Sequence, residues 1–144
     1  MLGRKDFTRS ELDQAKASVA AQLAAYRRLV GAVCTGGKVD ANVDAALRDL
    51  QAVFFNTLVV ALDRPFVHRV RPVSGKDGNP LNEVELIVDS LLNSGGVFRG
   101  NNVIKYVPAE AVVHLEVGDR IQLNEQQFEA LANAFFAELE RRFT

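Results

Sequence analysis

The sequence has few residues that could form cross-links, with one cysteine, two histidines and no tryptophan among its 144 residues. Cys34 has no second cysteine to form an internal disulfide, and no neighbouring cysteine or histidine that would indicate a zinc site or a nucleophile pair. Neither His68 nor His114 follows a glutamate at the spacing of a di-iron bundle, or a serine or cysteine at a known catalytic spacing. We therefore expect no metal and no cofactor, and the absence of a catalytic motif favours a protein that is not an enzyme.

An excess of charge of one sign and a long hydrophobic run are also missing. The 17 basic and 18 acidic residues nearly balance, so the sequence lacks the positive surface that would neutralise several phosphates, and we expect no nucleic-acid partner. No run approaches the roughly 20 apolar residues of a membrane span, and residues 1–6 do not resemble a secretory signal. These absences predict a cytoplasmic protein without a membrane partner.

The composition is that of one ordinary globular domain covering residues 1–144. Hydrophobic residues make up 48% of the chain and charged residues 24%, and this length buries a core without disulfides. Abundant alanine, valine and arginine suggest a bacterial source.

Two capping signals predict the first two helices. Thr8 and Glu11 have the spacing of a capping box, so a helix should begin near Arg9 and end at Thr35-Gly36-Gly37. A second helix should begin at Asp40 or Asn42 and end before Pro65, because the residue before a proline resists helical angles. The second half of that helix, Val53 to Leu62, is apolar almost all round, which is typical of a central core helix packed on several sides.

The second half of the chain predicts two further helices and a small β element. Asn79 followed by Pro80 predicts a helix start, and the pair Asn124 and Gln127 predicts the start of the last helix. Between these helices, residues 103–123 are rich in β-branched residues and predict two or three short strands. The expected fold is mainly α (α+β), about four helices packed together with a small β element between the third and fourth helices, with an all-α bundle as the alternative.

Charged and turn residues are densest between Asp63 and Glu83. Five of them could bind a small anionic ligand near the free N–H groups that begin the helix at Pro80, and these candidates are His68, Arg69, Arg71, Lys76 and Asn79. The alternative is a set of surface ion pairs around an ordinary connection, which is favoured because surface loops are often rich in charge. Within the loop, Gly78 is expected to have a positive φ angle.

The stretch from Leu62 to Arg69, continued by Gly75 to Val84, resembles the central block of a small family of uncharacterised actinobacterial proteins. The similarity extends to Val117–Ile121 and the C-terminal helix. No activity is attached to that family, so the resemblance implies a bacterial source and no function.

Two functions remain open. The first is a non-catalytic interaction or structural protein, which could form a homodimer because the apolar stripes of the first and last helices are expected to be wider than a monomer can cover. The second is an enzyme or sensor that binds a small anionic ligand at the loop of residues 63–83.

Overall fold

The computed structural model describes residues 3–34, 37 and 39–144. Its α-helices are α1 (Arg9–Cys34), α2 (Ala41–Asp63), α3 (Arg71–Ser74), α4 (Pro80–Asn93) and α5 (Glu125–Phe143). Single 3-10 turns cover Arg64–Phe66 and Pro108–Glu110. The prediction of a mainly helical fold is confirmed, and the all-α alternative describes it best, because the described residues contain isolated β-bridges in place of a sheet.

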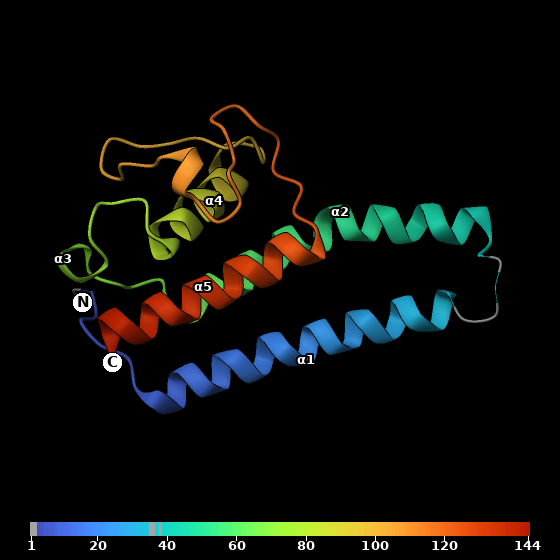
Figure 1. Ribbon diagram of the computed structural model, residues 1–144, viewed down its shortest axis with the longest axis horizontal. Helices are drawn as coiled ribbons and strands as arrows, with labels where there is room; N and C mark the ends of the chain where they lie inside the picture. The colour runs from blue at the N-terminus through green and yellow to red at the C-terminus, as the bar shows by residue number, and fades with distance from the viewer. Residues whose placement is uncertain (1–2, 35–36, 38) are drawn as a thin grey trace.

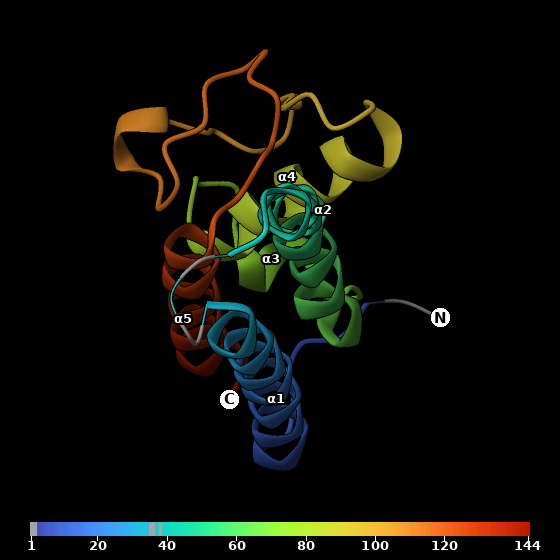
Figure 2. The ribbon, with the colours of Figure 1, turned by 90° about the vertical axis from the view of Figure 1, so that its right-hand side faces the viewer.

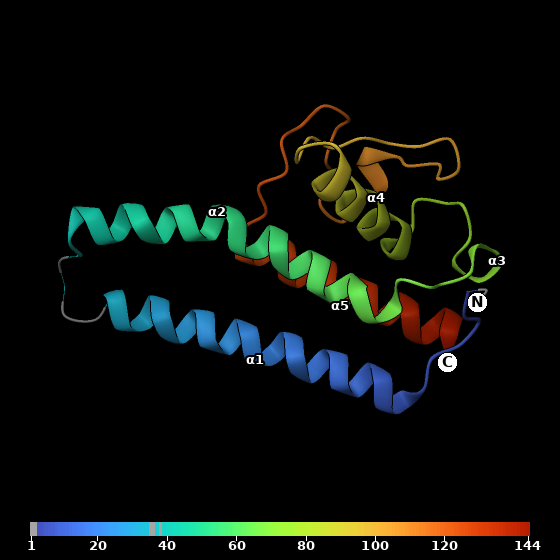
Figure 3. The same cartoon turned by 180° about the vertical axis from the view of Figure 1, so that it is seen from behind.

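The long helices α1 and α2 run antiparallel, and α5 lies against both of them over about half their length (Figures 1 and 3). Helix α4 packs on the other side of α2 and α5, as the end-on view in Figure 2 shows. The core therefore lies where α2, α4 and α5 meet. Among the described helices, α1 and α2 alone continue beyond the N-terminal end of α5, side by side, as a two-helix projection (Figure 1).

The helices begin where the sequence predicts. The backbone N–H of Glu11 donates to Thr8 Oγ1 at 3.1 Å, and the N–H of Thr8 donates to Glu11 Oε2 at 2.7 Å, so the capping box is complete. Asp40 caps α2, and Asn124 forms the predicted capping box with Gln127. The predicted end of α1 involves Thr35 and Gly36, which lie outside the described residues.

A group of phenylalanines fixes the end of α2 to both termini of the chain. Phe66 is fully buried in the 3-10 turn after α2, with ring centroids 4.9 Å from Phe7 and 6.1 Å from Phe135. Phe7 also contacts the ring of Phe143, and its N–H donates to Phe143 O at 2.8 Å. Aromatic pairs at these separations add to the free energy gained by burial. The turn at Phe66 therefore joins the beginning of α1 to the end of α5.

The strands predicted over residues 103–123 do not form. Pro108 begins a 3-10 turn in the middle of this stretch, and its neighbours pair only through isolated bridges, such as Asp77 with Lys105 and Val97 with Arg120. Some of the apolar side chains in this stretch contribute to the core, since Ile104, Val113 and Ile121 are buried, whereas Val103, Val107 and Val117 are exposed. The β-branched residues there belong to an irregular, partly buried segment rather than to a sheet.

Phe66 provides a test of this arrangement. Phe66→Ala should lower the free energy of unfolding by about 3–5 kcal/mol, because it leaves a cavity beneath three aromatic rings. Urea denaturation followed by circular dichroism measures the change. The neighbouring Val67 is 44% exposed, so Val67→Ala is the control and should change stability by less than about 0.5 kcal/mol. Equal effects of the two substitutions would contradict the central position of Phe66.

Candidate interaction surface

The structure places Arg69, one of the predicted ligand-binding residues, inside the protein. Its side chain is 4% exposed, and its Nη1 donates to Asp63 Oδ1 at 2.8 Å. Nη2 donates to Leu81 O at 3.3 Å, and the guanidinium lies 5.3 Å from the centroid of the Phe135 ring. Only Nε lacks a hydrogen-bond partner among the described residues. Arg69 thus joins the end of α2 to the first turn of α4.

Arg71 is used in the same way. Its Nη1 donates to Asn82 Oδ1 at 2.9 Å and to Gly75 O at 3.1 Å, and its Nη2 lies 2.6 Å from Glu85 Oε2. Asn82 is fully buried and donates in turn to Asp77 O at 2.7 Å. The guanidinium of Arg71 therefore holds the connection between α3 and α4 against the side of α4.

Asn79 caps α4 as the sequence predicts. Its Oδ1 accepts the N–H of Leu81 at 2.9 Å and that of Asn82 at 3.3 Å. Its Nδ2 donates to Ser74 O at 2.8 Å, so one buried side chain ties the loop to the helix. These first N–H groups of α4, which the anion hypothesis would use, are already satisfied within the chain.

The remaining two candidates, His68 and Lys76, are exposed. The structure thus brings Arg69, Arg71 and Asn79 together, but as a polar network that holds the loop. Anion binding at this loop stays a prediction, with little support from the geometry, because the two arginines already bind carboxylates and carbonyls of the protein.

The expectation of a positive φ angle at Gly78 is wrong. The positive angle, 75°, belongs to Gly75, at the end of α3. Glycine suits position 78 for a different reason, since a Cβ there would lie 3.1 Å from Lys105 O, a close contact that the neighbouring backbone would have to relieve by a small shift. The segment after α4 packs directly on the backbone of Gly78. Local turn preferences could not predict this contact, because the two segments are far apart in the sequence.

Sequence reasoning missed Glu83 as a central residue. Its side chain is buried in α4, where its two carboxylate oxygens accept the backbone N–H groups of Val112 and Val113 at 2.8 and 2.9 Å. Burial raises the pKa of the Glu83 carboxyl, while the two N–H donors act in the opposite direction. The sequence identified Glu83 only as an acidic residue near the start of a helix. It could not predict the hydrogen-bond partners, which lie about 30 residues away along the chain.

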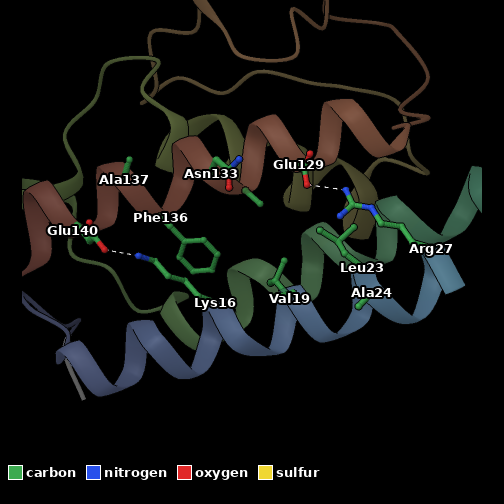
Figure 4. A pocket seen from close by; sticks show the side chains of 12 residues that line it. Lys16, Val19, Leu23, Ala24, Arg27, Glu129, Asn133, Phe136, Ala137 and Glu140 are labelled. Carbon is green, nitrogen blue, oxygen red and sulfur yellow. Dashed lines mark hydrogen bonds and ion pairs between the residues drawn. The ribbon is translucent and has the colours of Figure 1, made fainter.

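A groove of about 470 Å³ lies between α1 and α5 (Figure 4). Its apolar lining includes Val19, Leu23 and Phe136, and it is crossed at one end by the ion pair of Lys16 with Glu140. At the other end the side chain of Arg27 extends to α5, where its Nη2 lies 2.8 Å from Glu129 Oε2. The four charged residues that line the groove, Lys16, Arg27, Glu129 and Glu140, are thus paired with one another. No cluster of potential metal ligands occurs among the described residues.

Residues 28–34 of α1 and 41–50 of α2, here called the arm, form the projection beyond α5. Within these ranges no residue is buried. Large apolar side chains are nevertheless exposed there, including Leu29 at 46%, Val43 at 44% and Leu50 at 37%. The core position predicted from Val53 to Leu62 applies to the second half of α2, where Phe55, Leu58, Val59 and Leu62 are buried. The first half of α2 extends beyond α4 and α5.

A continuous apolar stripe follows the outer face of α2. Its members are uncharged and recur at alternating steps of three and four residues: Val43, Ala46, Leu50, Val53, Thr57 and Val60, here called the α2 seam. At about 100° per residue, the seam lies nearly opposite the buried face formed by Phe55, Leu58, Val59 and Leu62. Steps of three and four are the spacing with which helices pack in a coiled coil.

A shallow groove runs beside the seam, between α2 and the C-terminal end of α4, and is here called the α2–α4 groove. It has a volume of about 260 Å³ and is lined by Val53, Asn56, Thr57, Val60, Leu91 and Leu92. Val53 is 59% exposed and Leu92 is 63% exposed. The apolar surface therefore continues from the arm onto the body of the protein.

The segment Ala41–Phe66 is long and apolar enough to cross a membrane by length and composition alone, a weak criterion that core helices of soluble proteins also pass. Only 22% of its most apolar 18-residue window is buried.

The exposed apolar surface thus lies on α2, whereas the sequence analysis expected it on the first and last helices. The stripe of α5 is covered, since Phe128, Leu131, Phe135 and Leu139 are buried.

No family model, no curated protein and no solved structure matches the chain. The resemblance to an actinobacterial family therefore stays a prediction. Any functional argument has to come from the geometry of the chain itself.

Two substitutions at Asn79 can separate its role as the cap of α4 from its role as a hydrogen-bond donor to the loop. Asn79→Ala should lower the free energy of unfolding by about 2 kcal/mol, because it removes the cap of α4 and the hydrogen bond that Asn79 Nδ2 donates to Ser74 O. Asn79→Asp keeps the capping oxygen but loses the donor, so its cost should be intermediate. Urea denaturation measures both variants. An alanine variant as stable as the native chain would mean that the loop does not depend on Asn79.

Glu83 should make stability depend on pH. Its pKa is raised above the ordinary value of 4.5 by burial, so its contribution to stability is present below pH 4.5 and is lost as the pH rises through the folded-state pKa. Glu83→Gln cannot titrate. The free energy of unfolding of the native chain relative to this variant should therefore fall as the pH rises above about 4.5. Urea titrations between about pH 4 and pH 7 measure the difference, and the opposite slope would show that the two N–H donors dominate.

Proposed function

We propose that this protein is a non-catalytic interaction protein that forms a homodimer through the α2 seam. The observation that carries the proposal is the position of the seam: an uncharged stripe of helix–helix spacing that continues from the arm onto the body, exposed from Val43 to Thr57 and partly buried only at Val60. Exposed apolar surfaces of this size and continuity are typical of protein interaction sites.

The arm gives a second reason for a partner. Two helices that project without a third helix bury little apolar surface, and helical stability in proteins depends mainly on such packing. Within the arm, Val30 is only partly buried and Val43 and Leu50 are largely exposed. A second copy that covers the seam would supply the missing contacts, which fits an isologous dimer in which both copies use the same surface.

The catalytic alternative has less support. The residues predicted to bind an anion are hydrogen-bonded within the chain or exposed, and the α1–α5 groove is bounded by paired charges. An interaction role uses the surface that the structure leaves uncovered and requires no reactive group.

Val53→Asp should abolish the dimer. Light scattering on the native protein should give a mass of about twice 15.8 kDa. A carboxylate at the centre of an apolar interface costs several kcal/mol, so the variant should have the mass of a monomer. Valine and aspartate have similar helix propensities, so α2 itself should be little affected.

Val117→Asp is the matched control. Val117 is also 59% exposed but lies in a turn of the segment between α4 and α5, away from the seam. This variant should remain dimeric. A native protein that is monomeric at every concentration contradicts the proposal, and if that monomer also sediments with phospholipid vesicles, the seam binds a lipid surface instead.

A further inference from the structure

We infer that the second copy packs antiparallel along α2, so that the first turns of each α2 lie in the α2–α4 groove of the other copy. The inference rests on the proposed homodimer and specifies its geometry. Each copy would contribute the same two surfaces, the N-terminal end of the seam and the groove, which makes the contact isologous and closed.

The seam itself indicates a helix as the partner. Side chains at alternating steps of three and four residues pack between those of a second helix with the same spacing. The α2 seam of a second copy has the same spacing, so the two seams can pack against each other. In an antiparallel pair centred between Leu50 and Val53, Val43 of one copy lies opposite Val60 of the other, and Leu50 lies opposite Val53.

The position of the groove favours the antiparallel direction. Leu91 and Leu92 line the α2–α4 groove together with Val53, Thr57 and Val60, which form the end of the seam that is farther from Val43. An antiparallel partner brings its own Val43 to this end and covers Leu92, which is 63% exposed. A parallel partner would place Val43 beside its own counterpart and leave the exposed part of both grooves uncovered.

The area is sufficient for a specific contact. The 18 residues from Val43 to Val60 span about 26 Å, and a helix is about 10 Å wide, so the seam projects about 260 Å² on each copy. Interdigitated side chains bury about twice their projected area, so the two copies together lose on the order of 1,000 Å² of accessible surface. That value is near the lower limit for a biological interface, and the two α2–α4 grooves add to it.

Pairwise cysteine cross-linking tests the direction. In a Cys34→Ser background, Val43→Cys and Leu92→Cys are placed in separately purified chains of different length, which are mixed at a concentration where light scattering shows the dimer. Under oxidation, the mixture should form the mixed 43–92 disulfide at least about tenfold faster than either chain alone forms its own. A disulfide requires Cα atoms within about 7 Å. Leu92 lines the same groove as Val53, and Val43 and Val53 of one helix are about 15 Å apart. Positions 43 and 92 of one chain are therefore too far apart to cross-link, so a disulfide between them reports contact between two copies.

Each other outcome overturns the inference in a distinct way. Rapid cross-linking of Val43→Cys with itself would show a parallel dimer. A dimeric mass without the mixed disulfide would place the interface on another surface of the chain. In both cases a dimer persists, so the interaction role survives, whereas a monomeric native protein removes the proposed function together with the inference. Circular dichroism of both cysteine variants should match that of the native chain, and Val117→Cys mixed with Val43→Cys serves as the control that should cross-link slowly.

Discussion

A helix that is apolar on two opposite faces needs two partners, and within the described chain α2 has a partner for only one of its faces. Phe55, Leu58 and Leu62 pack into the core, while the α2 seam lies on the other side. The lengths of the helices make this unavoidable. Helices α1 and α2 have 26 and 23 residues, whereas α5 has 19 and α4 has 14, so the shorter helices end before the longer ones do. The exposed arm and the open groove both follow from this mismatch.

The position of α4 depends on a polar first turn. Asn79, Asn82 and Glu83 are buried there and bind backbone groups from the loop before the helix and from the segment near residue 112. Buried polar groups are tolerated only when their hydrogen bonds are satisfied, so this turn fixes the surrounding chain in one arrangement. The residues that looked most like a ligand site thus have a structural use: they hold an irregular region in place without a sheet.

The sequence predicted those features that depend on neighbouring residues. The capping boxes at Thr8 and Asn124 and the cap at Asn79 were visible because a few adjacent side chains determine them. Features set by distant segments could not be read in this way. The bonds of Glu83 to the region of residue 112 and the approach of Lys105 to Gly78 join segments about 30 residues apart, which no local spacing reports.

The sequence analysis expected exposed apolar surface on the first and last helices rather than on α2, and this error has the same cause. Hydrophobic periodicity identifies the faces of a helix but not how far its neighbours extend along it. The last helix showed a wide apolar stripe, and the fold covers it completely because α5 lies between α1, α2 and α4. Helix α2 appeared to be the most central helix, yet half of it extends beyond every helix except α1. A helix that is apolar all round is therefore evidence for several neighbours, and it leaves open whether those neighbours belong to the same chain. In this protein, the uncharged α2 seam and the exposed Leu92 beside it favour a neighbour from a second copy.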